Sequence, residues 1–245
     1  MNRVFLNLIV PFCLSLFAQS PDGQWILQKV DENFGSENKI SLSEMHIKGR
    51  RGDRTVVSKS WIQGKEKSFT EYLDPPRERG TKMLKLEDQL WTYTPSTDRT
   101  ILISGHMLRQ SVMGSDLSYE DLMEDTRLSD IYSAHILGKE VYSDRDCWLL
   151  ELTAKEPDVS YAVRKIWVDQ ERFVILKENR FAKSGKLLKT TDVKQVKYIS
   201  NRWVATDIIF KDVLKNGEGT EFVINSIEFG GDIPDYLFSK AALRK

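Results

Sequence analysis

The side chains that could carry out acid–base or metal chemistry are few in this sequence, and they lie far apart. The three histidines are His46, His106 and His135, and the chain contains neither an HxxxH nor a CxxC pair. Ligand pairs at such spacings are the usual signature of a metal site. A glycine-rich phosphate loop and a G-x-S-x-G nucleophile motif are absent as well. We therefore predict no catalytic residue, no metal site and no cofactor, in a protein that is not an enzyme.

Paired carboxylates also occur, such as Asp116 with Glu120 and Asp121. Acidic residues at the start of a short helix usually form a solvated face and complement the helix dipole. No histidine or nucleophile accompanies them, so they do not build an acid–base mechanism. Carboxylates from distant segments that meet only after folding are the alternative.

The N-terminal sequence indicates an export signal. Arg3 is followed by an uncharged, largely apolar run from Val4 to Phe17 and then by Ala18. This run is too short to span a bilayer, but it is typical of a secretory signal peptide. We expect a signal peptide at residues 1–18, one domain at 19–245 and a periplasmic location; a membrane-tethered N-terminus is the alternative.

Cysteine content and charge narrow the class further. Loss of the leader removes Cys13 and leaves Cys147 alone, so we expect no internal disulfide and a buried thiol in a strand. The 36 basic residues are balanced by 36 acidic ones. A nucleic-acid-binding protein needs a basic face, so nucleic acid is not an expected partner.

Short runs of strand type dominate the predicted elements. They are separated by turn signals such as Gly64, Asp74-Pro75-Pro76 and Asn216-Gly217. A helix is expected at 22–33, another at 118–125 and a short one at 233–245. Strands are expected at 40–49, 54–63, 66–73, 81–86, 90–94, 100–104, 160–168, 174–182, 187–199, 203–213 and 220–229, with alternation also around 147–153. Strands in sequence joined by tight turns favour an antiparallel meander.

The connection at 105–130 interrupts this rhythm and carries Met107, Met113 and Met123. A connection of this length is usually functional or mobile. Gly114 permits a positive φ, and Ser118 can cap the helix with Asp121 three residues on. Tyr119, Leu122 and Met123 would then share a helical face that covers an apolar concavity in the sheet. The alternative is that the apolar and aromatic side chains fill an ordinary core.

Several segments in colinear order carry a resemblance to a known family. They are Trp91-x-Tyr93-x-Pro95, SVMGSDLSYEDL at 111–122, CWLLELTAKEP at 147–157, KIWVDQERFVILKENRF at 165–181, NRWVATDIIF at 201–210 and IPDYLFSKAALRK at 233–245. With them the chain resembles LolA-like outer-membrane lipoprotein-sorting proteins over nearly the whole of 19–245.

The resemblance implies a mainly β fold: an incomplete antiparallel β-barrel or curved sheet covered by a few short helices. It also implies a hydrophobic cavity for acyl chains of lipoproteins or lipids, and a monomeric periplasmic carrier with an inner-membrane transporter as donor and an outer-membrane acceptor. An envelope-stress sensor of the RseB type and an accessory subunit of a lipid exporter are the alternatives. The family uses an arginine of the sheet to hold its cover closed, and the sequence assigns no position to it.

The predicted lipid-binding and covering residues come from the sheet and from the 105–130 connection. They are Trp91, Tyr93, Met107, Met113, Gly114, Leu117, Tyr119, Leu122, Met123, Trp148 and Trp167.

Overall fold

The computed structural model describes residues 21–35, 38–49, 52–124 and 127–245. The signal peptide expected at 1–18 lies outside these residues. Within them no helix is both long and apolar enough to cross a bilayer.

Thirteen strands form one sheet in which every pair of neighbours is antiparallel. They are β1 (Lys39–Ile47), β2 (Arg54–Gln63), β3 (Lys67–Asp74), β4 (Lys82–Leu86), β5 (Gln89–Thr94), β6 (Arg99–Ile103), β7 (Tyr132–Tyr142), β8 (Arg145–Ala154), β9 (Val163–Asp169), β10 (Ile175–Phe181), β11 (Leu187–Ile199), β12 (Arg202–Asp212) and β13 (Thr220–Phe229). The predicted strand runs are present, and β7 is a strand whose bounds the sequence pattern did not define.

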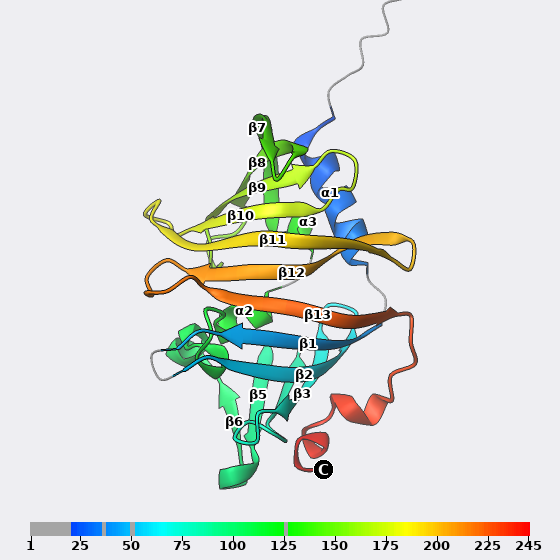
Figure 1. The fold of residues 1–245 in the computed structure, drawn as a ribbon, viewed down its shortest axis with the longest axis vertical. Helices are drawn as coiled ribbons and strands as arrows, with labels where there is room; N and C mark the ends of the chain where they lie inside the picture. The colour runs from blue at the N-terminus through cyan, green and yellow to red at the C-terminus, as the bar shows by residue number, and fades with distance from the viewer. Residues whose placement is uncertain (1–20, 36–37, 50–51, 125–126) are drawn as a thin grey trace, which may run out of the picture.

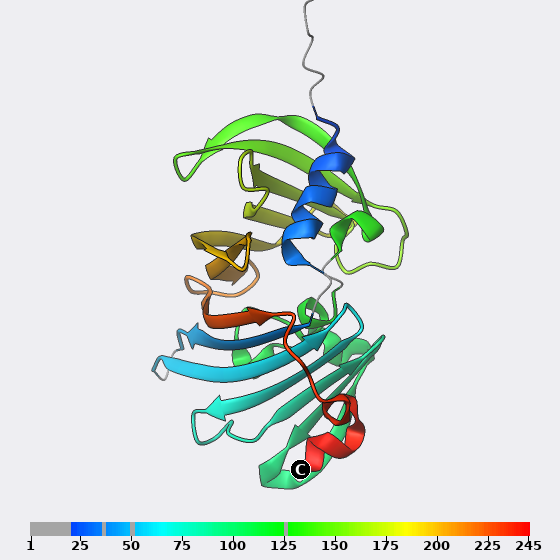
Figure 2. The same cartoon turned by 90° about the vertical axis from the view of Figure 1, so that its right-hand side faces the viewer.

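The sheet consists of two meanders joined by their end strands. The strand order is β6-β5-β4-β3-β2-β1-β13-β12-β11-β10-β9-β8-β7, so the first and last strands of the chain are paired in the middle. Figure 1 shows β1–β6 in the lower half and β7–β13 in the upper half of one continuous sheet, and Figure 2 shows that this sheet is strongly curved. The expected curved, incompletely closed antiparallel sheet with few helices is confirmed.

Helix α1 (Gly23–Phe34) lies across the upper half of the sheet (Figure 2). Its buried face carries Ile26, Leu27 and Val30, which pack with residues of β8 and β9. The helix ends at Gly35, where φ is +63° and the amide donates to the carbonyls of Asp31 and Glu32. A glycine suits this end because only glycine adopts a positive φ without steric cost.

The connection between β6 and β7 folds onto the inner face of the lower half. It contains the 3-10 helices η2 (Gly105–Arg109) and η3 (Val112–Gly114), then α2 (Tyr119–Met123) and α3 (Leu128–Ile131). Ser118 caps α2, its hydroxyl accepting from the Asp121 amide while the Asp121 carboxylate accepts from the Ser118 amide. The expected capping box is therefore confirmed, as is the positive φ of Gly114 at +72°.

The C-terminal segment covers the other face of the lower strands. Instead of one short helix it forms two 3-10 helices, η4 (Asp235–Phe238) and η5 (Lys240–Arg244). A further 3-10 helix, η1 (Pro95–Thr97), lies between β5 and β6. Ala242 and Leu243 are buried against Phe69 and Leu84. This second layer withdraws one face of β3–β5 from solvent and leaves the inner face for a separate site.

Candidate functional site

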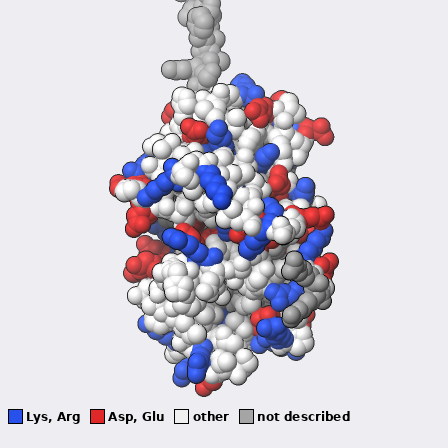
Figure 3. Space-filling view, turned by 90° about the vertical axis from the view of Figure 1, so that its left-hand side faces the viewer, with Lys and Arg blue, Asp and Glu red and all other residues white. Residues whose placement is uncertain are grey.

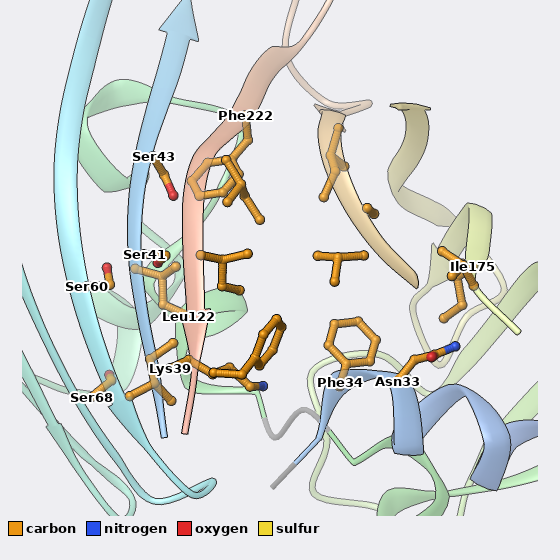
Figure 4. A pocket seen from close by; sticks show the side chains of 18 of the residues that line it. Asn33, Phe34, Lys39, Ser41, Ser43, Ser60, Ser68, Leu122, Ile175 and Phe222 are labelled. Atoms are coloured by element: carbon orange, nitrogen blue, oxygen red, sulfur yellow. The ribbon is translucent and has the colours of Figure 1, made fainter. Parts of the chain in front are cut away.

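A cavity of about 390 Å³ lies on the inner face where the two meanders meet. Its walls are the end of α1, strands β1–β5, helix α2, the turn before β10, and strands β12 and β13 (Figure 4). The lining residues are Val30, Asn33, Phe34, Lys39, Ser41, Ser43, Ser60, Ile62, Ser68, Thr70, Met83, Leu90, Leu122, Phe173, Val174, Ile175, Trp203, Val204, Ala205, Ile208, Phe222, Ile224, Ile227 and Phe229. Residues far apart in sequence therefore build one enclosed space.

Short hydroxyl side chains form one wall of the cavity. They alternate along β1–β3, at 41 and 43, at 60, and at 68 and 70. The hydroxyls of Ser60 and Thr70 lie 2.9 Å apart and are hydrogen-bonded. Ser and Thr side chains are too short to fill the space above the strands, so this wall keeps the cavity open.

Apolar side chains line the rest of the cavity. Phe222 and Ile224 come from β13, which is paired with β1, and Trp203, Ala205 and Ile208 come from β12. The sequence-based prediction missed both walls. Ser41-x-Ser43, Ser58-x-Ser60 and Ser68-x-Thr70 repeat with period two on neighbouring strands, and this pattern was the signal that one face carries small side chains.

The end of α1 closes the cavity on a third side. The Asn33 side-chain amide donates to the carbonyls of Arg172 and Phe173 at 2.7 and 3.0 Å, which ties the helix to the turn before β10. Phe34 follows, and the Lys39 ammonium lies 6.0 Å from the centroid of its ring. A basic side chain thus borders an otherwise apolar space.

Of the predicted residues, only Leu122 lines this cavity, from α2. The others in the 105–130 connection pack beside it in a cluster with Met45, Val56 and Tyr72. These neighbours are Met107, Met113, Leu117, Tyr119 and Met123, and Gly114 lies in the same turn. The connection therefore seals one end of the inner face, and Leu122 is its tip toward the cavity.

The four predicted aromatic residues of the sheet lie elsewhere. Trp91 and Tyr93 pack against the C-terminal 3-10 helices, because strand alternation directs them to the outer face of β5. Trp148 packs in the cluster under α1, next to Phe173. Trp167 lies in a separate cluster with Cys147, and its indole nitrogen donates to Glu140 at 2.7 Å. None of the four lines the cavity. The sequence-based prediction was wrong here because the presence of a residue in a strand does not tell which face of the sheet its side chain takes.

A buried cluster of charges holds α2 on the side away from the cavity. Asp121 accepts from Arg180 at 3.1 Å and from the Tyr161 hydroxyl at 2.7 Å, and it is also paired with Lys189. Glu124, just after the helix, lies 3.4 Å from Arg180 and is paired with Arg164. The helix is thus fixed to β9, β10 and β11 by directional, charge-assisted contacts.

Glu178 connects the two arginines beneath this helix, at 2.9 Å from each. Burial opposes ionisation of Asp121 and Glu178, but the neighbouring cations outweigh it and hold both pKa values below the ordinary range. Burial opposes the charge of Arg164 and Arg180, but Glu178 and Glu124 outweigh it and raise the pKa values of both arginines. The cluster pairs three carboxylates with three cations.

A third arginine contacts the same connection from β2. The Arg54 guanidinium donates to the carbonyl of Met113, and a Cβ added at Gly114 would lie 2.9 Å from one of its nitrogens. Glycine suits this position because of its positive φ, and the flexible end of the Arg54 side chain lies close to it. Three arginines of the sheet, Arg54, Arg164 and Arg180, therefore contact the segment between β6 and β7.

In the part of the chain that the structure describes, no three His, Cys, Asp or Glu side chains meet in a way that could hold a metal ion. Cys147 is a free, fully buried thiol on β8, as expected. Burial raises its pKa to about 11. This thiol contributes nothing to the cavity.

The comparisons with known proteins agree with this architecture. A family model described as “Uncharacterized protein”-like matches residues 64–245. None of the curated proteins compared with the chain matches it.

Three solved structures share the fold over almost the whole chain. A LolA superfamily protein from Nitrosomonas europaea is 27% identical, with a TM-score of 0.76, and covers 91% of this chain and 100% of its own. A candidate outer membrane lipoprotein-sorting protein domain from Vibrio parahaemolyticus is 24% identical, with a TM-score of 0.79 and coverages of 91% and 98%. A DUF1329 family protein from Desulfovibrio piger is 24% identical, with a TM-score of 0.81 and coverages of 90% and 97%. The chain belongs to the family of the model that matches it, and its membership among LolA-like proteins, expected from the sequence, is confirmed.

Proposed function

We propose that this protein is a periplasmic carrier that binds an acyl chain of a lipid or lipoprotein in the inner cavity. The observation that carries the proposal is the cavity itself, in a LolA-like fold, with apolar side chains on β12 and β13 and short side chains on β1–β3. Its volume of about 390 Å³ is in the range of small-molecule sites in proteins. An extended chain of methylene groups suits the apolar part of this lining.

The driving force would be the removal of the chain from water. Each buried methylene contributes about 0.8 kcal/mol, so a chain of ten gains about 8 kcal/mol before the entropy of binding is subtracted. Contacts with Trp203, Phe222 and Ile224 are non-directional. The cavity would therefore accept acyl chains that differ in length or branching, which suits a carrier.

Delivery toward the outer membrane is the remaining part of the proposal. It combines the export signal expected at 1–18 with the fold shared with the Vibrio parahaemolyticus protein, which is described as a candidate for lipoprotein sorting. The lipid would be received from an inner-membrane transporter and passed to an outer-membrane acceptor. Because charges hold α2 in place at one end of the cavity, ligand entry is proposed beside the end of α1.

The test begins with protein purified from the cell envelope, whose extracted lipid is measured by mass spectrometry. A fluorescent fatty-acyl probe is then titrated against the wild type and Ala205→Phe, which fills the cavity from β12. We expect at least about tenfold weaker binding to this variant, which corresponds to a loss of roughly 1.4 kcal/mol. Ala241→Phe, an exposed site in η5, is the matched control and should bind as the wild type does. The proposal fails if the wild type binds no probe and carries no lipid, or if Ala205→Phe binds normally.

A further inference from the structure

A second hollow of about 400 Å³ adjoins the apolar cavity. The two spaces share three lining residues, Asn33, Phe173 and Trp203. The second hollow differs in chemistry, because Lys29 of α1, Arg172 of the turn before β10 and Arg202 of β12 line it. An apolar compartment and a cationic one therefore lie side by side. Residues of α1 line both of them, and Figure 2 shows where this helix lies.

Both guanidinium groups rest on aromatic rings that line the apolar cavity. Arg172 lies 4.6 Å from the centroid of Trp203, and Arg202 lies 4.4 Å from that of Phe229. A guanidinium that stacks by its face presents its N–H donors at its edge, where carboxylates and phosphates bind. Because the cations occupy the ring faces, these rings do not form an aromatic cage for a cationic head.

Carboxylates also line the second hollow, and each has a partner. Glu32 accepts from Lys29 at 2.7 Å, and Glu171 accepts from Arg145 at 2.6 Å. The Arg172 Nε lies 3.8 Å from Asp169. The lining itself thus has three cations and two carboxylates, and Lys39 adds another cation on the cavity side.

The opposite side of the molecule is shown in Figure 3. Basic and acidic side chains are interspersed over its upper and middle parts, and a broad uncharged area lies at the lower left. At the α1 end, by contrast, three cations and two carboxylates line the hollow that adjoins the apolar cavity.

We infer that the ligand is an amphiphile with an anionic head, carboxylate or phosphate, whose tail occupies the apolar cavity and whose head lies in the second hollow against Arg172 and Arg202. This inference rests on the proposed acyl-chain binding and names the head group that accompanies the chain. Head and tail then have separate sites, so affinity depends on the tail and selectivity on the head. Net affinity for the head comes from charge-assisted hydrogen bonds at the hollow.

The test uses four probes with the same fourteen-carbon tail: tetradecanoate, tetradecyl phosphate, tetradecanol and tetradecyltrimethylammonium. Each is titrated at pH 8 below its critical micelle concentration by competition with the fluorescent acyl probe. We expect the tighter anion to bind about tenfold more strongly than the alcohol, and the cation to bind most weakly. The relative affinities of the two anions tell whether a carboxylate or a phosphate head fits better.

Equal binding of anions and alcohol, or tighter binding of the cation, would overturn the inference while leaving acyl-chain binding intact. Binding of none of the four probes would defeat the proposed function itself. Arg172→Gln and Arg202→Gln should each reduce the ratio of the anion affinity to the alcohol affinity by about threefold to tenfold, both affinities being measured on the same variant. Lys59→Gln is the control, because Lys59 stacks on Trp61 on the other face of β2. If an arginine variant does not fold in a thermal melt, the order of the four probes on wild-type protein still decides.

Discussion

The two sides of α2 contact regions of opposite chemistry. On one side Leu122 borders a cavity whose contacts are mostly apolar and replaceable. On the other side, Asp121 and Glu124 enter a buried cluster with Arg164, Arg180 and Lys189. A helix of five residues has little stability of its own. Its position is therefore set by the charges, and the cavity is left free to exchange its contents.

The contrast between the two sides of α2 explains how a binding space can persist inside a curved sheet. Apolar surfaces collapse onto each other unless something holds them apart. Here the charged cluster and the short side chains of β1–β3 keep the walls separated. Directional contacts maintain the shape, and non-directional contacts are available to the ligand.

Removing a charge from the cluster should have the largest effect. Arg164→Met removes one of the two arginines that Glu124 and Glu178 share and leaves only Arg180 to pair with both. Loss of one member of a buried ion network costs about 3–5 kcal/mol, because an uncompensated charge remains. Urea unfolding monitored by circular dichroism measures this loss. Lys48→Met, which breaks the exposed pair with Glu218, serves as control and should leave the urea midpoint unchanged. Equal effects of both variants would contradict the importance of burial.

Two matched substitutions separate the cavity side of the connection from its packed side. Leu117 is 7% exposed within the apolar cluster, whereas Leu122 is 39% exposed beside the cavity. Leu117→Asp should destabilise the fold by about 2–4 kcal/mol, because it buries a carboxylate among apolar side chains.

Leu122→Asp should leave the melting temperature nearly unchanged and weaken the acyl probe about threefold to tenfold, which is a cost of roughly 0.7–1.4 kcal/mol. Thermal melts and probe titrations on both variants make the comparison. If Leu122→Asp unfolds the protein, α2 belongs to the core rather than to the rim of a binding site.

The charged cluster should also make stability depend on pH in the acid range. The folded-state pKa values of Asp121 and Glu178 lie below their ordinary values of 3.8 and 4.5. Between the two sets of values the unfolded chain binds more protons, so the free energy of unfolding falls as the pH falls through that window. Urea unfolding between pH 7 and pH 2.5 should show full stability above about pH 5 and progressive loss below about pH 4.

Asp121→Asn supplies the control for this pH dependence. The pKa of Asp31 is raised by burial and acts in the opposite direction, but it is the same in both proteins. The variant should therefore have a smaller acid slope than the wild type. An identical slope would mean that the cluster does not contribute.

The smallest effect is expected at Cys147. Its thiol is buried and has a pKa raised to about 11, so little thiolate exists at neutral pH. A thiol reagent should label the native protein far more slowly than the protein in urea. Cys147→Ala should cost about 1 kcal/mol and leave probe binding unchanged. Fast labelling of the native thiol would indicate an opening of β8 that the cavity model does not include.

Local sequence features predicted much of the fold. Alternation and turn residues indicated most strands, and Ser118 with Asp121 indicated the start of α2. Gly114 indicated a positive φ. These features act over a few residues, so they can be recognised along the chain.

The sequence did not predict which strands would face the cavity. The pairing of β1 with β13 joins residues about 190 positions apart, such as Lys39 with Phe229, and no local pattern encodes it. This pairing places Ser41 beside Ile227 and Ser43 beside Ile224, and all four line the cavity. Trp91 and Trp148 were predicted to line the cavity because they are large and apolar. In the structure they pack in other clusters because of the direction of their side chains.

The amino-acid sequence by itself determined a β-rich chain with an apolar connection, a capped short helix and one buried thiol, because each depends on residue type and short-range periodicity. Only the tertiary structure decided the position of the cavity, the charged cluster of Arg164, Glu178 and Arg180 with α2, and the cationic hollow at Arg172 and Arg202. Each of these is assembled from segments far apart in the chain. Their chemistry arises from which faces meet when a curved sheet joins its first strand to its last.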